Sequence, residues 1–185
     1  MADHLPGMLP EHLRHWPGLW IRRGDEIVPA DQEDVDTARN YPSWADKGPL
    51  VRGRRLTIMA AHCSHGVGKA VRVIHVFEIT EPGSAVYVMG PKPVLGEYVD
   101  DQPATAPAAA DDSALRPLAY DGRTLASPAV DYNFDITSYV FAEPGTHRIV
   151  WKVDDLASNV LTIEVGHGNA PFNAVPGVSS EGGKS

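Results

Sequence analysis

The stretch from Asp131 to Val165 constrains the fold of this chain more than any other part of its sequence. Apolar side chains recur at every second position in three runs: Tyr132, Phe134 and Ile136, then Ile149, Trp151 and Val153, then Leu161, Ile163 and Val165. A period of two residues is that of a β-strand with one buried face. Turn-forming residues separate the runs, at Glu143-Pro144-Gly145-Thr146 and at Asp154-Asp155. We therefore expect three consecutive strands in an antiparallel meander.

Further strands are expected earlier in the chain, at residues 56–61, 70–79 and 85–89. The segment 70–79 is apolar on both faces, because Ile74 and Val76 alternate with Val71, Val73 and Phe77. A strand of this kind is covered on both sides, so we expect the N-terminal segment or a partner to lie over its outer face. Residues 62–68 (HCSHGVG) are expected to form a loop between strands. The 16 prolines and 17 glycines favour many turns over a helical bundle.

Residues 144–151 (PGTHRIVW) and 158–165 (SNVLTIEV) carry a resemblance to known domains. They resemble the last strands of immunoglobulin-like and fibronectin type III-like domains. In many such domains a Pro-Gly-Thr-Tyr turn opens the penultimate strand, and the Tyr makes a corner hydrogen bond. His147 holds that position here, and its imidazole can donate to a backbone carbonyl. The resemblance implies an all-β, antiparallel immunoglobulin-like sandwich, a fold that many unrelated functions share.

The sequence predicts three regions. Residues 1–50 are expected to form an extended arm rich in Pro and Trp, with a helical turn over 31–39, that packs on the domain or on a partner. Residues 51–165 are expected to form the sandwich, and residues 166–185 a flexible C-terminal tail. Large aromatic side chains are seldom left in water. Trp16, Trp20 and Trp44 of the arm and Phe172 of the tail are therefore the expected partner-binding residues.

Composition and charge exclude several classes of function. The formal net charge of −8 argues against binding to nucleic acid. A single cysteine precludes a disulfide within the chain. Because the sequence contains neither a secretory signal pattern nor an apolar run of membrane-spanning length, we expect a cytoplasmic protein that does not enter membranes.

The segment 51–72 holds five basic residues, Arg52, Arg54, Arg55, Lys69 and Arg72, and no acidic residue. One interpretation is a patch that docks an anion or a partner. The alternative, which we favour, is a strand edge guarded by charge.

His62, Cys63 and His65 form the one cluster with the character of a metal site. Two imidazoles and a thiolate suit zinc or copper, with a further ligand from His147 or a carboxylate. The alternative is a hydrogen-bonded hairpin tip in which Cys63 is a small, half-buried side chain. His75 is expected to be a hydrogen-bonded core residue and not a ligand, because the strand carries it away from the loop.

Three functional hypotheses follow. The first is a non-catalytic, immunoglobulin-like accessory subunit that associates with protein, either copies of itself or a larger catalytic chain, in an oligomer. The second is a metal-binding protein or metalloenzyme that uses the His-Cys-x-His loop. The third is a sandwich that binds a small ligand or carbohydrate, with Trp20, Trp44 or Tyr98 as stacking platforms. The first is favoured over catalysis because the sequence shows neither a nucleophile elbow nor a phosphate-binding loop.

Overall fold

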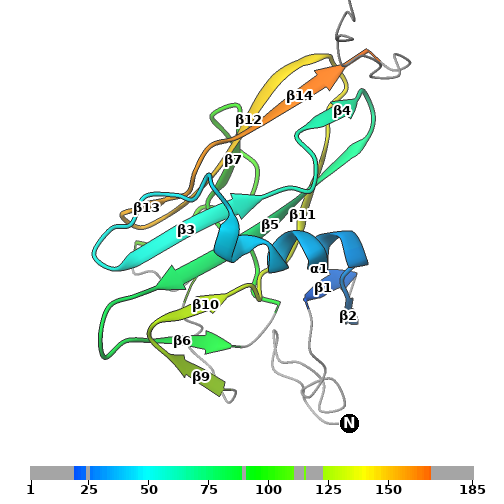
Figure 1. Cartoon of the computed structure of the whole chain (residues 1–185). Coiled ribbons are helices and arrows are strands. Elements are labelled where there is room, and N and C mark those ends of the chain that lie inside the picture. The colour runs from blue at the N-terminus through cyan, green and yellow to red at the C-terminus, as the bar shows by residue number, and fades with distance from the viewer. Residues whose placement is uncertain (1–18, 24–25, 89–90, 111–114, 116–122, 168–185) are drawn as a thin grey trace, which may run out of the picture.

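A computed structural model describes residues 19–23, 26–88, 91–110, 115 and 123–167 of the chain. Strands dominate this part of the chain (Figure 1), which confirms the all-β class predicted from the alternation. The helices are α1 (Gln32–Arg39) and the 3-10 helix η2 (Tyr41–Ser43). The strands are β1 (Trp20–Arg23), β2 (Glu26–Pro29), β3 (Arg54–Met59), β4 (Ser64–Gly66), β5 (Ala70–Ile79), β6 (Ala85–Val88), β7 (Glu97–Val99), β8 (Gln102–Pro103), β9 (Arg123–Ala126), β10 (Ala129–Asp131), β11 (Thr137–Val140), β12 (Gly145–Val153), β13 (Leu156–Ala157) and β14 (Leu161–Gly166).

The long strand β5 organises the first of the two larger sheets. Strand β3 pairs antiparallel with one side of β5, with Leu56 opposite Phe77. Two short strands pair antiparallel with its other side: β10 along its C-terminal half and β11 along its N-terminal half. Strand β11 is the last strand of this sheet among the described residues.

Strand β12 organises the second large sheet, whose order is β4-β14-β12-β7-β8 with β13 also paired to β12. Every pair in it is antiparallel except β4 with β14, which is parallel. Side chains of β14 alternate strictly between buried and exposed, as the sequence pattern predicts. Asp154 and Asp155 form the turn after β12, which agrees with the sequence prediction.

One apolar core lies between the two large sheets. The predicted set Ile149, Trp151, Phe134, Leu161 and Ile163 belongs to a single buried cluster with apolar residues of β3 and β5. Trp151 is fully buried and its indole N–H donates to the Leu95 carbonyl oxygen at 2.9 Å. An indole that is buried with its polar atom paired stabilises the core without an unsatisfied donor.

A second, smaller cluster covers the outer face of β5 and β3. Its buried members are Leu19, Ala38, Tyr41, Met59, Ile74 and Val76. Figure 1 shows α1 crossing the face of β5, and the Tyr41 hydroxyl donates to Glu78 Oε2 at 2.5 Å. The described part of the arm therefore lies on its own domain, where it covers the second apolar face of β5.

Two sequence predictions about this region are wrong. The run Tyr132, Phe134 and Ile136 does not form one strand, because Phe134 enters the main core whereas the other two pack against the outer cluster. Asp131 Oδ1 accepts the Asn133 backbone N–H at 2.9 Å, and this side-chain bond replaces a ladder bond as the backbone turns. The chain then continues as β11, which pairs with β5 and not with β12, so the expected three-stranded meander is split between two sheets.

The segment predicted to be a loop, residues 62–68, contains strand β4. After β3 leaves the first sheet, β4 joins the second sheet, with Ser64 beside Glu164 and His65 beside Val165. Backbone bonds extend the junction, since the Val67 N–H donates to the Gly166 carbonyl oxygen at 3.1 Å. Three residues are too few to show a period, which is why the pattern did not reveal this strand.

Candidate functional site

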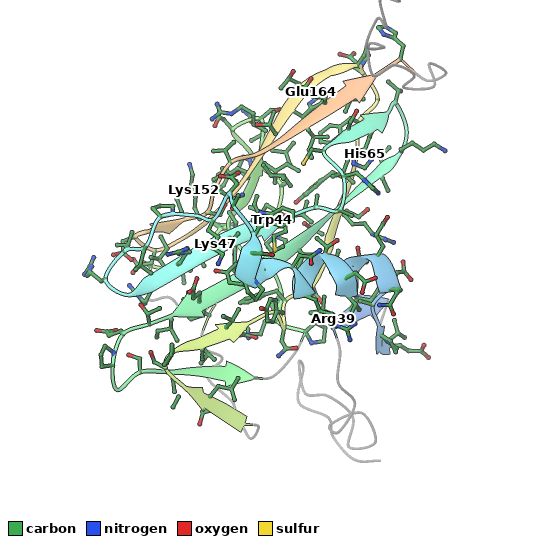
Figure 2. The ribbon with its side chains drawn as sticks, in the orientation of Figure 1. Arg39, Trp44, Lys47, His65, Lys152 and Glu164 are labelled. Atoms are coloured by element: carbon green, nitrogen blue, oxygen red, sulfur yellow. The ribbon has the colours of Figure 1, made fainter. Side chains whose placement is uncertain are left out.

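A polar cleft of about 270 Å³ lies between the N-terminal turn of α1, strand β4 and the start of β5. Its walls are formed by Glu33, Asp34, Ala60, Ala61, His62, His65, Ala70 and Arg72. The cleft thus contains both histidines of the predicted metal motif. Figure 2 shows His65 on β4, and Trp44 beyond the opposite end of α1.

Arg72, on the outer face of β5, holds the N-terminal turn of α1 over the cleft. Its guanidinium lies 2.5 Å from Asp31 Oδ2, 3.2 Å from Glu33 Oε2 and 3.1 Å from Asp34 Oδ1. Burial raises the pKa of Asp34, and the Arg72 charge opposes that shift. Three carboxyl groups share one guanidinium, so negative charge exceeds positive charge among the described groups at this end of α1. The rim of the cleft is therefore acidic.

The two histidines of the motif are bound to the surrounding protein. His62 Nε2 lies 3.1 Å from Glu33 Oε1, and His65 Nε2 lies 2.8 Å from the His62 carbonyl oxygen. Cys63 is exposed. Desolvation, with a smaller effect of the Asp46 carboxylate, raises the pKa of its thiol, so the thiolate that a metal site or a nucleophile needs is disfavoured at neutral pH.

Within the described residues, no group of three or more His, Cys, Asp and Glu side chains is arranged to hold a metal ion. His147, named as a further ligand, lies elsewhere: its Nδ1 is 2.7 Å from Asp100 Oδ2. The zinc or copper hypothesis therefore rests on the sequence motif alone and remains a prediction for metal analysis.

His75 is fully buried between the sheets, as expected for a core residue. Its Nε2 lies 2.8 Å from Glu97 Oε1, and the Tyr139 hydroxyl donates to Glu97 Oε2. His75 and Glu97 have no exposed side-chain surface, and the Trp151 ring packs nearly perpendicular to the imidazole with 5.0 Å between ring centres. Together with the half-buried Tyr139, these two residues have the composition of a catalytic relay, but neither the imidazole nor the carboxylate reaches the surface.

The four arginines of the basic stretch pair with acidic residues from other segments. Arg52 and Arg54 both contact Asp155, and Arg54 lies 3.1 Å from it. Arg55 Nε lies 3.6 Å from Glu78 Oε2, and Arg72 is bound to α1. For Arg54 and Arg55 of the outer strand β3, these pairs agree with the interpretation as a charged strand edge, because an open anion site needs guanidinium groups free of carboxylates. Arg72 lies in the central strand β5 and binds the start of α1 instead.

The expected aromatic contact residues lie in different surroundings. Trp44 is half-buried against the outer cluster, Trp20 begins β1, and Trp16 and Phe172 lie outside the described residues. Tyr98 lines a separate open cleft of about 350 Å³ with Lys152 and Asp154. The Lys152 ammonium lies 5.0 Å from the centre of the Tyr98 ring, so it occupies one face of this proposed stacking platform.

A feature that the sequence interpretation missed is the edge of β11 beside the cleft. Ser138 and Val140 are exposed, and they pair in register with Arg72 and Ala70, two residues of the cleft wall. Val140 is 62% exposed, the largest exposed fraction among the large apolar side chains described. The signal was present in the sequence as a strand, Thr137–Val140, without charge, proline or glycine.

No protein-family model matches this chain, and comparisons with curated proteins and with solved structures find no significant similarity.

Proposed function

We propose that this chain is a non-catalytic, immunoglobulin-like sandwich that associates with another protein chain in an oligomer or a larger complex. The observation that carries the proposal is the outer edge of β11, which pairs with no further strand among the described residues. Natural sheets block their edges with charged residues, proline or a covering segment, because an open edge pairs with other chains. Two other outer strands follow this rule, with Arg54 and Arg55 in β3 and Pro103 in β8. Strand β11 has no such residue and presents Val140 to solvent.

The order of the strands supports the immunoglobulin-like part of the proposal. In immunoglobulin constant domains, strands A, B, E and D form one sheet, and strands C, F and G form the other. Here β3, β5 and β11 pair in one sheet, whereas β7, β12 and β14 pair in the other. Their order along the chain matches A, B, E and C, F, G. The side of β11 that strand D would occupy carries no strand among the described residues.

A second contact supports the same assignment. His147 stands where the corner tyrosine of such domains stands, and its Nε2 lies 3.4 Å from the Glu143 carbonyl oxygen four residues upstream. The tyrosine corner makes a bond of this kind to backbone a few residues upstream. Phe141 stacks on the same imidazole at 4.0 Å between ring centres, which fixes the turn between the two sheets.

The placement of reactive side chains favours binding over catalysis. His75 and Glu97 are sealed in the core, and the thiol of Cys63 has a raised pKa. Catalysis by these groups would need access in the first case and a thiolate in the second.

The test compares the mass in solution of three full-length proteins isolated from their native source under mild conditions. Val140→Lys adds a charge to the β11 edge. Val160→Lys is the matched control, because Val160 is also an exposed valine, at 39%, but precedes β14 of the other sheet. Wild type and Val160→Lys are expected in assemblies larger than one chain, and Val140→Lys as a single chain. A wild-type protein that runs as a single chain, or an assembly indifferent to Val140→Lys, contradicts the proposal.

A further inference from the structure

We propose that the β11 edge takes up an extended segment of another protein, and that a lysine or arginine of this segment is bound at the acidic rim of the α1–β4 cleft. This inference rests on the proposed function and names the kind of partner. The mode is strand addition, in which backbone bonds supply affinity and a neighbouring pocket selects a side chain.

The geometry of β11 brings an added strand next to the cleft. Ser138 and Val140 face outward beside Arg72 and Ala70, which line the cleft. A strand paired to the free side of β11 lies about 5 Å from it, and about 10 Å from β5. Its outward side chains alternate, so one lies beside Val140 and another beside Ser138. Ser138 is small and leaves a path across β11 toward Arg72 and the first turn of α1.

Charge decides which side chain fits this path. Asp31 and Glu33 are 56% and 53% exposed, and they share Arg72 with the buried Asp34. Neither lysine nor a second arginine lines the cleft. A cationic side chain that crosses Ser138 therefore meets surplus carboxylate, whereas an acidic one is repelled. The net charge of −8 for the chain acts in the same direction at longer range.

The shape of the same path favours a long side chain. Lysine and arginine carry a flexible apolar stem and a terminal charge, so the stem lies along Ser138 while the charge reaches Asp31 and Glu33. The exposed face of Val140 would contact an apolar residue of the added strand, two positions away from the basic residue that lies beside Ser138. The fitting segment is thus extended, with an apolar and a basic residue separated by one residue.

The experiment measures binding of fluorescent ten-residue peptides to the full-length protein by polarisation at low salt. The peptides alternate threonine and valine, and one outward position is lysine, glutamine or glutamate. We expect the lysine peptide to bind about fivefold more tightly than the glutamine peptide, the effect of a partly exposed ion pair. Salt should reduce this preference, and the glutamate peptide should bind most weakly.

Protein variants separate the edge from the rim. Asp31→Asn and Glu33→Gln should each remove most of the lysine preference without changing the affinity of the glutamine peptide. Asp36→Asn is the matched control, because this carboxylate is 59% exposed but pairs with Arg39, whereas Asp31 and Glu33 pair with Arg72. Val140→Lys should weaken binding of every peptide, and Val160→Lys should weaken none.

Two results contradict the inference in distinguishable ways. Equal binding of the three peptides, with weakening by Val140→Lys, overturns the basic-residue inference and leaves the proposed association in place. Failure of every peptide to bind, in a protein that runs as a single chain, overturns both. A concentration-dependent dimer of the purified chain that Val140→Lys dissolves assigns the edge to a second copy and also overturns the inference.

Discussion

Removing the Glu97 carboxylate is predicted to destabilise the protein more than replacing its whole polar cluster. Glu97 has no exposed side-chain surface and accepts bonds from His75, at 2.8 Å, and from Tyr139. Glu97→Ala leaves the buried His75 and the half-buried Tyr139 hydroxyl without this acceptor. Two hydrogen-bond donors left without their acceptor, at about 1–3 kcal/mol each, make an expected cost of about 3–5 kcal/mol. The triple variant His75→Leu, Glu97→Leu, Tyr139→Phe removes both donors together with their acceptor, and we expect it within about 1 kcal/mol of wild type or above it.

The same carboxylate predicts how stability depends on pH. Burial by itself raises the pKa of Glu97, but the His75 charge and the bonds from His75 and Tyr139 outweigh it and hold the pKa below the ordinary 4.5. A depressed carboxyl pKa contributes stability that is fully present above the unfolded value and is lost as the pH falls through the folded value. Wild type should therefore lose stability below about pH 4.5, and the triple variant should lose less over the same range.

The assay is urea unfolding at pH 7 and at several values below 4.5, followed by tryptophan fluorescence and circular dichroism. Trp151 packs against His75 in the core, so its emission reports on this region. A loss of 3–5 kcal/mol corresponds to a fall of about 6–20 °C in the melting temperature for a chain of this size. The reasoning is refuted if Glu97→Ala costs under 1 kcal/mol, or if the triple variant is no more stable than Glu97→Ala.

Three further predictions concern single features. Trp151→Ala should cost about 3–5 kcal/mol in urea unfolding, because a fully buried indole leaves a cavity; a cost below 1 kcal/mol would contradict the core assignment. The bond to Asp100 raises the pKa of His147, so an NMR titration should place it above 6.5 and Asp100→Asn should lower it; an unchanged midpoint would count against the pair. If His62 and His65 bind zinc or copper, the purified protein should contain nearly stoichiometric metal that the double alanine variant lacks. A metal-free protein that takes up neither ion on titration would end that hypothesis.

The parts of the fold that sequence could predict are those with a long, regular period. Strands β12 and β14 can be predicted because each shows several alternations in a row, and β5 because its long run is apolar on both faces. The stretch around Phe134 shows the same period and is not a strand, because its alternate residues face different clusters. Periodicity records which positions are apolar, but not which of two apolar surfaces each one meets.

The candidate site was predicted only in part, for a related reason. His62 and His65 do line the cleft, since neighbouring positions in a short segment stay close in space. The ion pairs of Arg72 could not be predicted from the sequence. The three carboxylates that bind this guanidinium come from the N-terminal end of α1, about forty residues earlier in the chain. The open edge of β11 was equally hidden, because whether a strand has one neighbour or two is a property of the sheet.

The parallel pair of β4 and β14 has a consequence for how the protein is made. Strand β4, an early strand of the main fold, lies beside β14, the last strand among the described residues, with Ser64 against Glu164. At about 5–20 residues per second, β4 leaves the ribosome some 5–20 s before β14 does. The second sheet therefore cannot close during most of synthesis, and its final step is a non-local pairing of the slow kind. A chain that ends within β14 would thus lose the pairing of β14 with β12 and its pairing with β4. Strand β4 would then have no partner in the second sheet.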